Sequence, residues 1–148
     1  MVSANNSQEE AHVKRVLVVD DEPSILLSLS HLFSNDEVTV IASSRIEDAE
    51  EALERYVFDL VIVDIRLSGI EGIEGLELLS YIKSIRPETK VILMTAYGSE
   101  VMRESALRRG AYYYYEKPVD MNSLVKKAGD CGIPVGINKQ KGGAGCLP

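Results

Sequence analysis

The sequence is short of positive charge and of long apolar runs, and each shortage excludes a class of protein. With 16 Lys and Arg against 23 Asp and Glu, the 148 residues carry a formal net charge of −7, which repels phosphate backbones, so we predict no direct nucleic-acid partner. No apolar stretch approaches the roughly 18 residues that a membrane helix requires. The start, MVSANNSQEE, has neither the basic residues nor the apolar stretch of a secretory signal. We therefore expect a cytoplasmic protein that does not bind membranes.

Cysteine is almost as scarce. Cys131 and Cys146 lie in a glycine-rich stretch with no His or Cys at metal-ligand spacing, so we interpret them as incidental thiols.

The length of the chain suits a single domain with one hydrophobic core. We predict a flexible leader over residues 1–13, one domain over 14–128, and a tail over 129–148 whose six glycines and two prolines cannot bury a core.

Apolar runs and periodic stretches alternate along the chain. Residues 15–20, 59–64 and 90–96 are almost continuously apolar, which is typical of strands covered on both faces, and 37–43 and 111–116 have strand patterns. The helical patterns between them predict an α/β fold, a doubly wound parallel sheet with helices on both faces. The predicted helices are 24–33 after a first-turn Pro23, 44–56 with Ser44 and Glu47 at capping-box spacing, 76–85 ended by Arg86 and Pro87, 99–109 ended by Gly110, and a short one before Gly129.

Polar side chains follow the predicted strands at the points where they end. These are Asp20 and Asp21 after the first strand, Asp64 after the third, Thr95 after the fourth and Lys117 after the fifth. In a doubly wound sheet, ligands bind at this edge. Clustered carboxylates repel one another unless a cation joins them, and hard oxygen ligands at an open edge suit Mg²⁺ or, failing that, Mn²⁺.

Such an edge can carry out phosphoryl transfer, which depends mostly on positioning and charge neutralisation. The Lys117 ammonium supplies a second cation, and the Thr95 hydroxyl supplies a hydrogen-bond donor. We predict Asp64 as the nucleophile, because it ends a central strand and its backbone leads into the glycine-containing loop RLSGIEG.

Four segments, VVDDEP, LVIVDIRLSG, VILMTAYGS and YYEKP, together resemble the receiver domain of two-component response regulators. They occur in the family's order and at compatible spacings across residues 14–128, and MTAYGS is most similar to receivers of the nitrogen-regulatory activator group. The resemblance implies a flavodoxin-like sheet of five parallel strands in the order 2-1-3-4-5. It also implies a signalling phosphoprotein with no enzymatic activity beyond self-catalysed phosphotransfer and autodephosphorylation. The duplicated GIE after Asp64 departs from the family pattern.

The resemblance implies a role for each matching residue. Asp64 would accept phosphate from a histidine kinase or a histidine phosphotransfer protein. Asp21 would bind the metal directly, and Asp20 would assist through water or directly. Asp64 and the Arg66 main-chain carbonyl would be the other metal ligands. The Thr95 hydroxyl, the Ala96 backbone amide and Lys117 would receive the phosphoryl oxygens, and the Lys117–Pro118 bond would be cis.

The same resemblance makes Tyr114 a switch, since it lies three residues before Lys117. When Thr95 moves toward the phosphoryl group, Tyr114 would turn inward and reshape the surface of the fourth helix, fifth strand and fifth helix. The alternative is that all four tyrosines of 112–115 are simply strand formers. A downstream protein or output domain would lie outside this chain, and phosphorylation-dependent homodimers stay open.

Three other functions compete with this hypothesis. A haloacid-dehalogenase-like phosphatase would need a DxD motif on the first strand, where Asp20 and Asp21 are adjacent. A flavodoxin-like binding module would need a phosphate loop rich in Ser, Thr and Gly, which the acidic DDEP replaces. A receiver-fold scaffold that acts without phosphorylation is disfavoured by the complete set of site residues, yet stays open.

Overall fold

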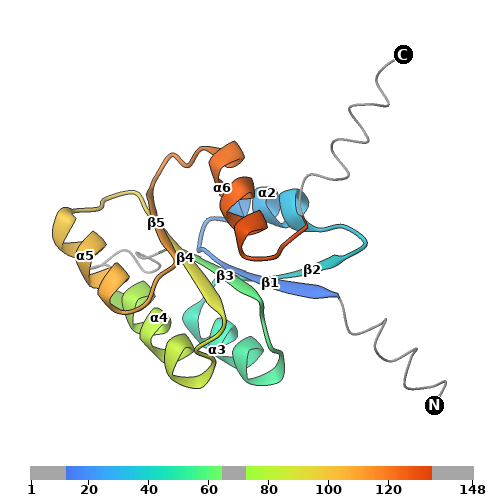
Figure 1. The fold of residues 1–148 in the computed structure, drawn as a ribbon, viewed down its shortest axis with the longest axis horizontal. Coiled ribbons are helices and arrows are strands. Elements are labelled where there is room, and N and C mark those ends of the chain that lie inside the picture. The colour runs from blue at the N-terminus through green and yellow to red at the C-terminus, as the bar shows by residue number, and fades with distance from the viewer. Residues whose placement is uncertain (1–12, 65–72, 135–148) are drawn as a thin grey trace.

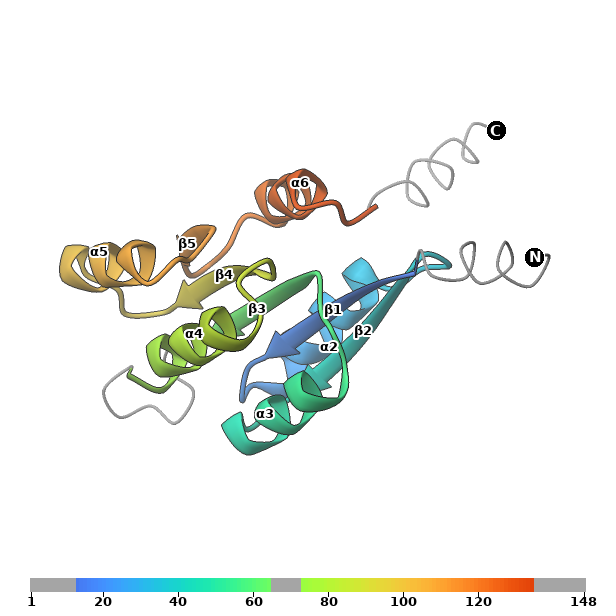
Figure 2. The ribbon, with the colours of Figure 1, turned by 60° about the horizontal axis from the view of Figure 1, so that its bottom comes forward.

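The structure is a computed structural model that describes residues 13–64 and 73–134. Five parallel strands form one sheet in the order β2-β1-β3-β4-β5, and a helix follows each strand, as the sequence predicts (Figures 1 and 2). Within these ranges, no helix has the length and apolar character needed to cross a membrane. The elements are β1 (Lys14–Val19), α2 (Pro23–Phe33), β2 (Val38–Ser43), α3 (Ile46–Arg55), β3 (Leu60–Asp64), α4 (Ile73–Ile85), β4 (Lys90–Thr95), α5 (Glu100–Arg108), β5 (Tyr113–Glu116) and α6 (Met121–Asp130).

The sheet is covered on both faces, which explains why its central strands are apolar throughout. Helices α3, α4 and α5 cover one face, and α2 and α6 cover the other (Figure 1). Every residue of β3 is buried, with side chains entering the two cores alternately. The central strands therefore have rigid, fully packed surroundings, and their carboxyl ends are fixed in position.

One predicted helix start is confirmed and another is wrong. Pro23 occupies the first turn of α2, where its missing N–H costs nothing. Helix α3, however, has Arg45 at its N-cap, in an extended conformation and with no side-chain cap. Ser44 therefore lies one residue too early for a capping box, and the Glu47 carboxylate instead accepts a hydrogen bond of 3.4 Å from Arg45 Nε.

Helix α6 is longer than predicted, since it continues past Gly129 to Asp130. The turn that follows α6 contains Gly132, whose φ of +92° is in the left-handed region, and the Ile133 N–H donates back to the Ala128 carbonyl at 3.0 Å. Ile133 is 1% exposed and joins the core between the sheet and helices α2 and α6, so the beginning of the predicted tail contributes to the hydrophobic core. The domain boundaries themselves stay predictions.

Candidate functional site

The strand register brings the predicted site residues together at one edge of the sheet. Val19 pairs with Val63, so Asp20 and Asp64 follow as neighbours at the ends of β1 and β3. Asp64 pairs with Met94 on the other side, which places Thr95 at the end of β4. Thr95 in turn pairs with Glu116, and Lys117 comes next. Convergence of these groups is thus a property of the backbone pairing.

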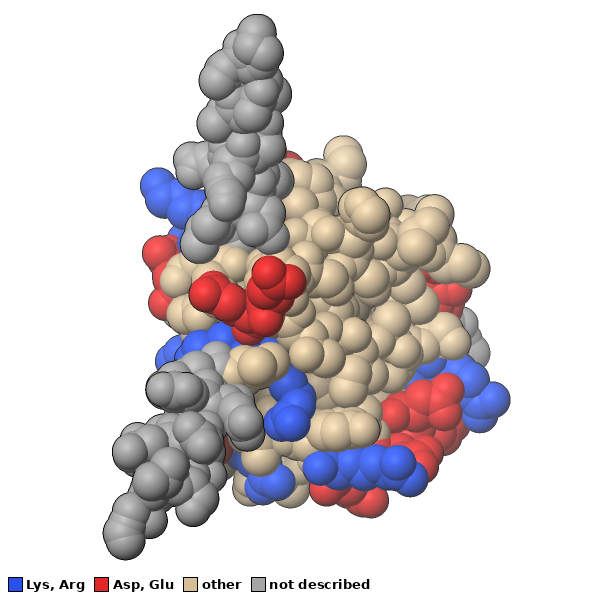
Figure 3. Space-filling model, turned by 90° about the vertical axis from the view of Figure 1, so that its right-hand side faces the viewer, with Lys and Arg blue, Asp and Glu red and all other residues tan. Residues whose placement is uncertain are grey.

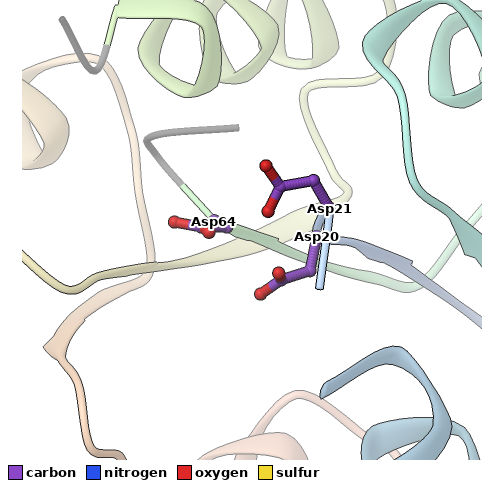
Figure 4. A group of neighbouring side chains, drawn as sticks. All are labelled: Asp20, Asp21 and Asp64. Atoms are coloured by element: carbon purple, nitrogen blue, oxygen red, sulfur yellow. The ribbon is translucent and has the colours of Figure 1, made fainter. Parts of the chain in front are cut away.

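Three carboxylates and one ammonium form the centre of the site. One carboxylate oxygen from each of Asp20, Asp21 and Asp64 lies within 4.8 Å of the others (Figure 4). Lys117 Nζ donates to Asp20 Oδ2 at 3.1 Å and to Asp64 Oδ2 at 3.3 Å. Asp20 is fully buried and Asp64 is 6% exposed, whereas Asp21 faces solvent.

The buried part of the site carries more negative than positive charge, since two carboxylates share one ammonium, and the pKa shifts of Asp20 and Lys117 agree with this imbalance. Burial raises the pKa of Asp20, and the charge of Asp64 raises it further, while the Glu22 N–H, bonded to Asp20 Oδ1 at 2.9 Å, and Lys117 lower it. Burial alone would lower the pKa of Lys117, but the charges of Asp64 and Asp20 outweigh burial and raise it. One ammonium therefore does not compensate the buried negative charge.

The donor set fits a divalent cation. Three hard carboxylate oxygens on a partly open edge, one of them destabilised by burial and repulsion, are the ligands that Mg²⁺ binds in proteins. Asp20, Asp21 and Asp64 would hold the ion. The predicted fourth ligand, the Arg66 carbonyl, lies outside the described residues, as does the duplicated GIE.

Thr95 and Lys117, the two site residues on β4 and just after β5, are joined by a backbone hydrogen bond. The Lys117 N–H donates to the Thr95 carbonyl at 2.7 Å, and the Lys117–Pro118 bond is cis, as expected. The Thr95 side chain is fully buried, and its hydroxyl oxygen accepts the Tyr97 N–H at 3.2 Å. Thr95 Oγ1 can still donate one hydrogen bond. Ala96, next along the chain, is exposed.

The four tyrosines have different surroundings. Tyr114 is buried in the core beneath α3, α4 and α5, whereas Tyr115 packs into the opposite core and its hydroxyl shares a 2.7 Å hydrogen bond with Ser123. Tyr113 packs against the Tyr115 ring and under the Lys127 ammonium. Tyr113 and Tyr115 therefore have contacts of their own, whereas the Tyr114 hydroxyl lies beside Gly98, next to a space that Thr95 Cγ2 also borders.

An apolar pocket that the sequence did not predict adjoins the site. It has a volume of about 390 Å³ and opens between α2 and the segment that joins β5 to α6. Helix α2, which forms one wall, contains no Asp, Glu, Lys or Arg, and Figure 3 shows a broad face that also lacks them. The lining residues are Ile25, Leu29, Met94, Lys117, Pro118, Val119 and Met121.

Comparison with known proteins identifies the family. A family model described as the response regulator receiver domain matches residues 16–129. The chain belongs to the response regulator receiver family. Receiver domains of response regulators are signalling domains of two-component systems, and this receiver domain has the fold and the acidic edge that its sequence predicts.

Individual relatives agree with this assignment. The receiver domain is 37% identical over 111 residues to the response regulator protein PilR of Pseudomonas aeruginosa, and 36% identical over 109 residues to the transcriptional regulatory protein ZraR of Escherichia coli. These matches cover 75% and 74% of the chain, but 24% of each relative. The chain thus spans about a quarter of the length of these relatives.

Solved structures agree on the fold. A CheY-like receiver domain protein from Methanospirillum hungatei superposes with a TM-score of 0.72 at 31% identity, covering 80% of this chain and 92% of that one. The beryllofluoride-activated NtrC4 receiver domain dimer gives 0.71 at 28% identity, covering 80% and 96%. NtrC4 is a neighbour of the kind predicted from the MTAYGS segment.

Proposed function

We propose that this receiver domain accepts a phosphoryl group on Asp64 from a histidine kinase or a histidine phosphotransfer protein. The observation that supports this most strongly is the cluster of Asp20, Asp21 and Asp64, two of which, Asp20 and Asp64, form ion pairs with the Lys117 ammonium. An Asp64 oxygen would form the new bond to phosphorus while the bond from phosphorus to the donor's nitrogen breaks, leaving its electron pair on the histidine. The product is an acyl phosphate.

Each neighbour of Asp64 has a role that its position supports. Mg²⁺ or Mn²⁺, held by Asp20, Asp21 and Asp64, would neutralise charge on the transferred group. Lys117, which already contacts an Asp64 oxygen, would pair with a phosphoryl oxygen. The Thr95 hydroxyl and the Ala96 N–H would donate to the other oxygens, and a contribution from the Arg66 carbonyl to the metal stays a proposal.

Transmission of the signal would involve Tyr114, whose ring lies on the α5 side of the sheet. The sequence predicts that Tyr114 turns inward on phosphorylation, and in this structure its side chain is already buried. Movement of Thr95 toward the phosphoryl group would then stabilise the inward orientation of Tyr114 and change the surface of α5, β5 and α6, which are the fourth helix, fifth strand and fifth helix of the domain. To take such an equilibrium from 1:99 to 99:1 requires about 5.5 kcal/mol of preference for one state. The changed surface would bind a downstream protein, an output domain, or a second copy of this receiver domain to form a homodimer.

The apolar pocket beside Lys117 suits the phosphodonor. A donor protein must bring its histidine to Asp64, and the uncharged surface of α2 next to the pocket can bury apolar side chains without breaking ion pairs. Phosphotransfer of this kind takes place in the cytoplasm, which is where we expect the protein to act.

The test is intact-mass spectrometry after incubation with acetyl phosphate and Mg²⁺. We expect the wild type to gain one phosphoryl group and Asp64→Ala to gain none, since the variant lacks the attacking oxygen. Asp48→Ala, which removes an exposed carboxylate on α3, is the matched control and should gain the group.

Each outcome bears on a specific alternative. A phosphoryl group that persists in Asp64→Ala would contradict Asp64 as the acceptor. No gain in the wild type, with Mg²⁺ binding confirmed by calorimetry, would favour the scaffold that acts without phosphorylation. Repeated turnover of a phosphate ester would favour the phosphatase.

A further inference from the structure

Gly98 lies between the exposed Tyr97 and Ser99, the N-cap residue of α5. Its backbone does not require glycine, because the positive-φ glycines among the described residues are Gly110 and Gly132. What it provides is space. A Cβ atom at this position would overlap the Tyr114 hydroxyl and would lie 2.9 Å from Glu116 Oε2 and 3.0 Å from Thr95 Cγ2.

The Tyr114 hydroxyl depends on this space. The residue is 9% exposed, and its hydroxyl has no hydrogen-bond partner of good geometry among the described residues. Burial raises the pKa of Tyr114, and the Glu116 charge adds to this, while the nearby Ser99 backbone only partly offsets it. A buried hydroxyl without a partner is unfavourable, so apolar packing of the ring must hold it there. A small loss of packing space would therefore be enough to turn it outward.

We propose that Gly98 is a positioning residue that admits the Tyr114 hydroxyl beside Thr95 and so permits the inward orientation of Tyr114. The inference rests on the proposed function, in which Thr95 and Tyr114 transmit phosphorylation of Asp64. A methyl group at this position would have three neighbours to displace. At 3.0 Å, Thr95 Cγ2 need shift only slightly, and Glu116 is exposed and can swing away, whereas the new methyl group would overlap the Tyr114 hydroxyl. The Tyr114 side chain is then the group that must leave.

The experiment compares Gly98→Ala with Gly129→Ala by nitration with tetranitromethane, resolved to single tyrosines by tandem mass spectrometry. Gly129 is a matched control because a Cβ there meets nothing within 4 Å. Tyr97, which is 70% exposed, is the internal reference. We expect Tyr114 to be protected in the wild type and in Gly129→Ala, and to react about tenfold more in Gly98→Ala, which corresponds to about 1.4 kcal/mol.

A double-mutant cycle separates this contact from a general loss of stability. Tyr114→Phe removes the atom that the new methyl group would overlap. In urea denaturation, Gly98→Ala should therefore lower the midpoint clearly in the wild type and much less in the Tyr114→Phe background. Equal losses in both backgrounds, or a Tyr114 that stays protected in Gly98→Ala, would overturn the proposal.

The nitration is done without a phosphodonor, so its result does not depend on phosphotransfer. A wild type that gains no phosphoryl group from acetyl phosphate would refute the proposed function of Asp64. The reactivity of Tyr114 in the two alanine variants would still decide whether Gly98 controls its orientation.

Discussion

Lys117→Ala is expected to lower the free energy of unfolding by about 3–5 kcal/mol at neutral pH in the absence of Mg²⁺, the usual loss when one partner of a buried ion pair is removed. Lys117 is 18% exposed and bonds to Asp20 and Asp64, whose side chains are 0% and 9% exposed. Without the ammonium, the two carboxylates would repel each other with no cation between them. Phosphoryl transfer to Asp64 should be lost as well.

The measurement is urea denaturation of Lys117→Ala beside Lys126→Ala, which removes an exposed lysine of α6 and should change stability by less than about 0.5 kcal/mol. Added Mg²⁺ should recover part of the loss in Lys117→Ala, because it supplies the missing positive charge. The defect should also shrink in acid. Protonation of Asp20 removes the repulsion, so the loss is full above the raised pKa of Asp20 and absent below its unfolded value of 3.8. If the loss of stability in Lys117→Ala changed neither with added Mg²⁺ nor with pH, Lys117 would act through packing alone.

The fold and the converging site residues could be predicted because both follow from the backbone. Continuous apolar runs are compatible with strands buried on both faces, and parallel pairing brings their carboxyl ends to one edge whatever residues follow. Asp64 and Lys117 were identifiable for this reason. Helix ends depend on local contacts, so the capping box at Ser44 and the end of α6 were predicted incorrectly.

Contacts between side chains distant in sequence were beyond prediction. Nothing in the sequence links Gly98 to Tyr114, a residue on the next strand, because the two come together only in the folded structure. A glycine directly before the N-cap serine of α5 is the only signal that could have drawn attention to it.

The sequence also contains no indication that Asp20 would be buried and Asp21 exposed. The two are adjacent in sequence, but they leave the end of β1 on opposite sides, and only Asp20 is enclosed by the domain (Figure 4). The resemblance gave Asp21 the direct metal contact and Asp20 an assisting one. Because solvent screens the Asp21 charge, the buried Asp20 contributes more than Asp21 to the electrostatic cost of the site.

Asp20→Asn is accordingly expected to stabilise the domain in the absence of Mg²⁺, by about 1–3 kcal/mol. The loss of repulsion from Asp64 and the loss of attraction to Lys117 are each up to about 4 kcal/mol at 4 Å and nearly cancel. The remaining term is the cost of burying the Asp20 charge, which the neutral asparagine avoids. The asparagine carbonyl can still accept the Glu22 N–H, and Lys117 keeps Asp64 as its partner.

Thermal unfolding with EDTA and with saturating Mg²⁺ checks this prediction, with Asp21→Asn as the matched control. Asp20→Asn should raise Tm in EDTA and lose most of the increase that Mg²⁺ gives the wild type, whereas Asp21→Asn should weaken the Mg²⁺ response with little change in EDTA. Because the pKa of Asp20 is raised, its charge costs stability as pH rises above 3.8, so the gain from Asp20→Asn should be present at neutral pH and vanish in acid. A lower Tm for Asp20→Asn in EDTA would mean that the carboxylate stabilises the fold through Lys117. The imbalance of charge at this edge would then not be what drives Mg²⁺ binding.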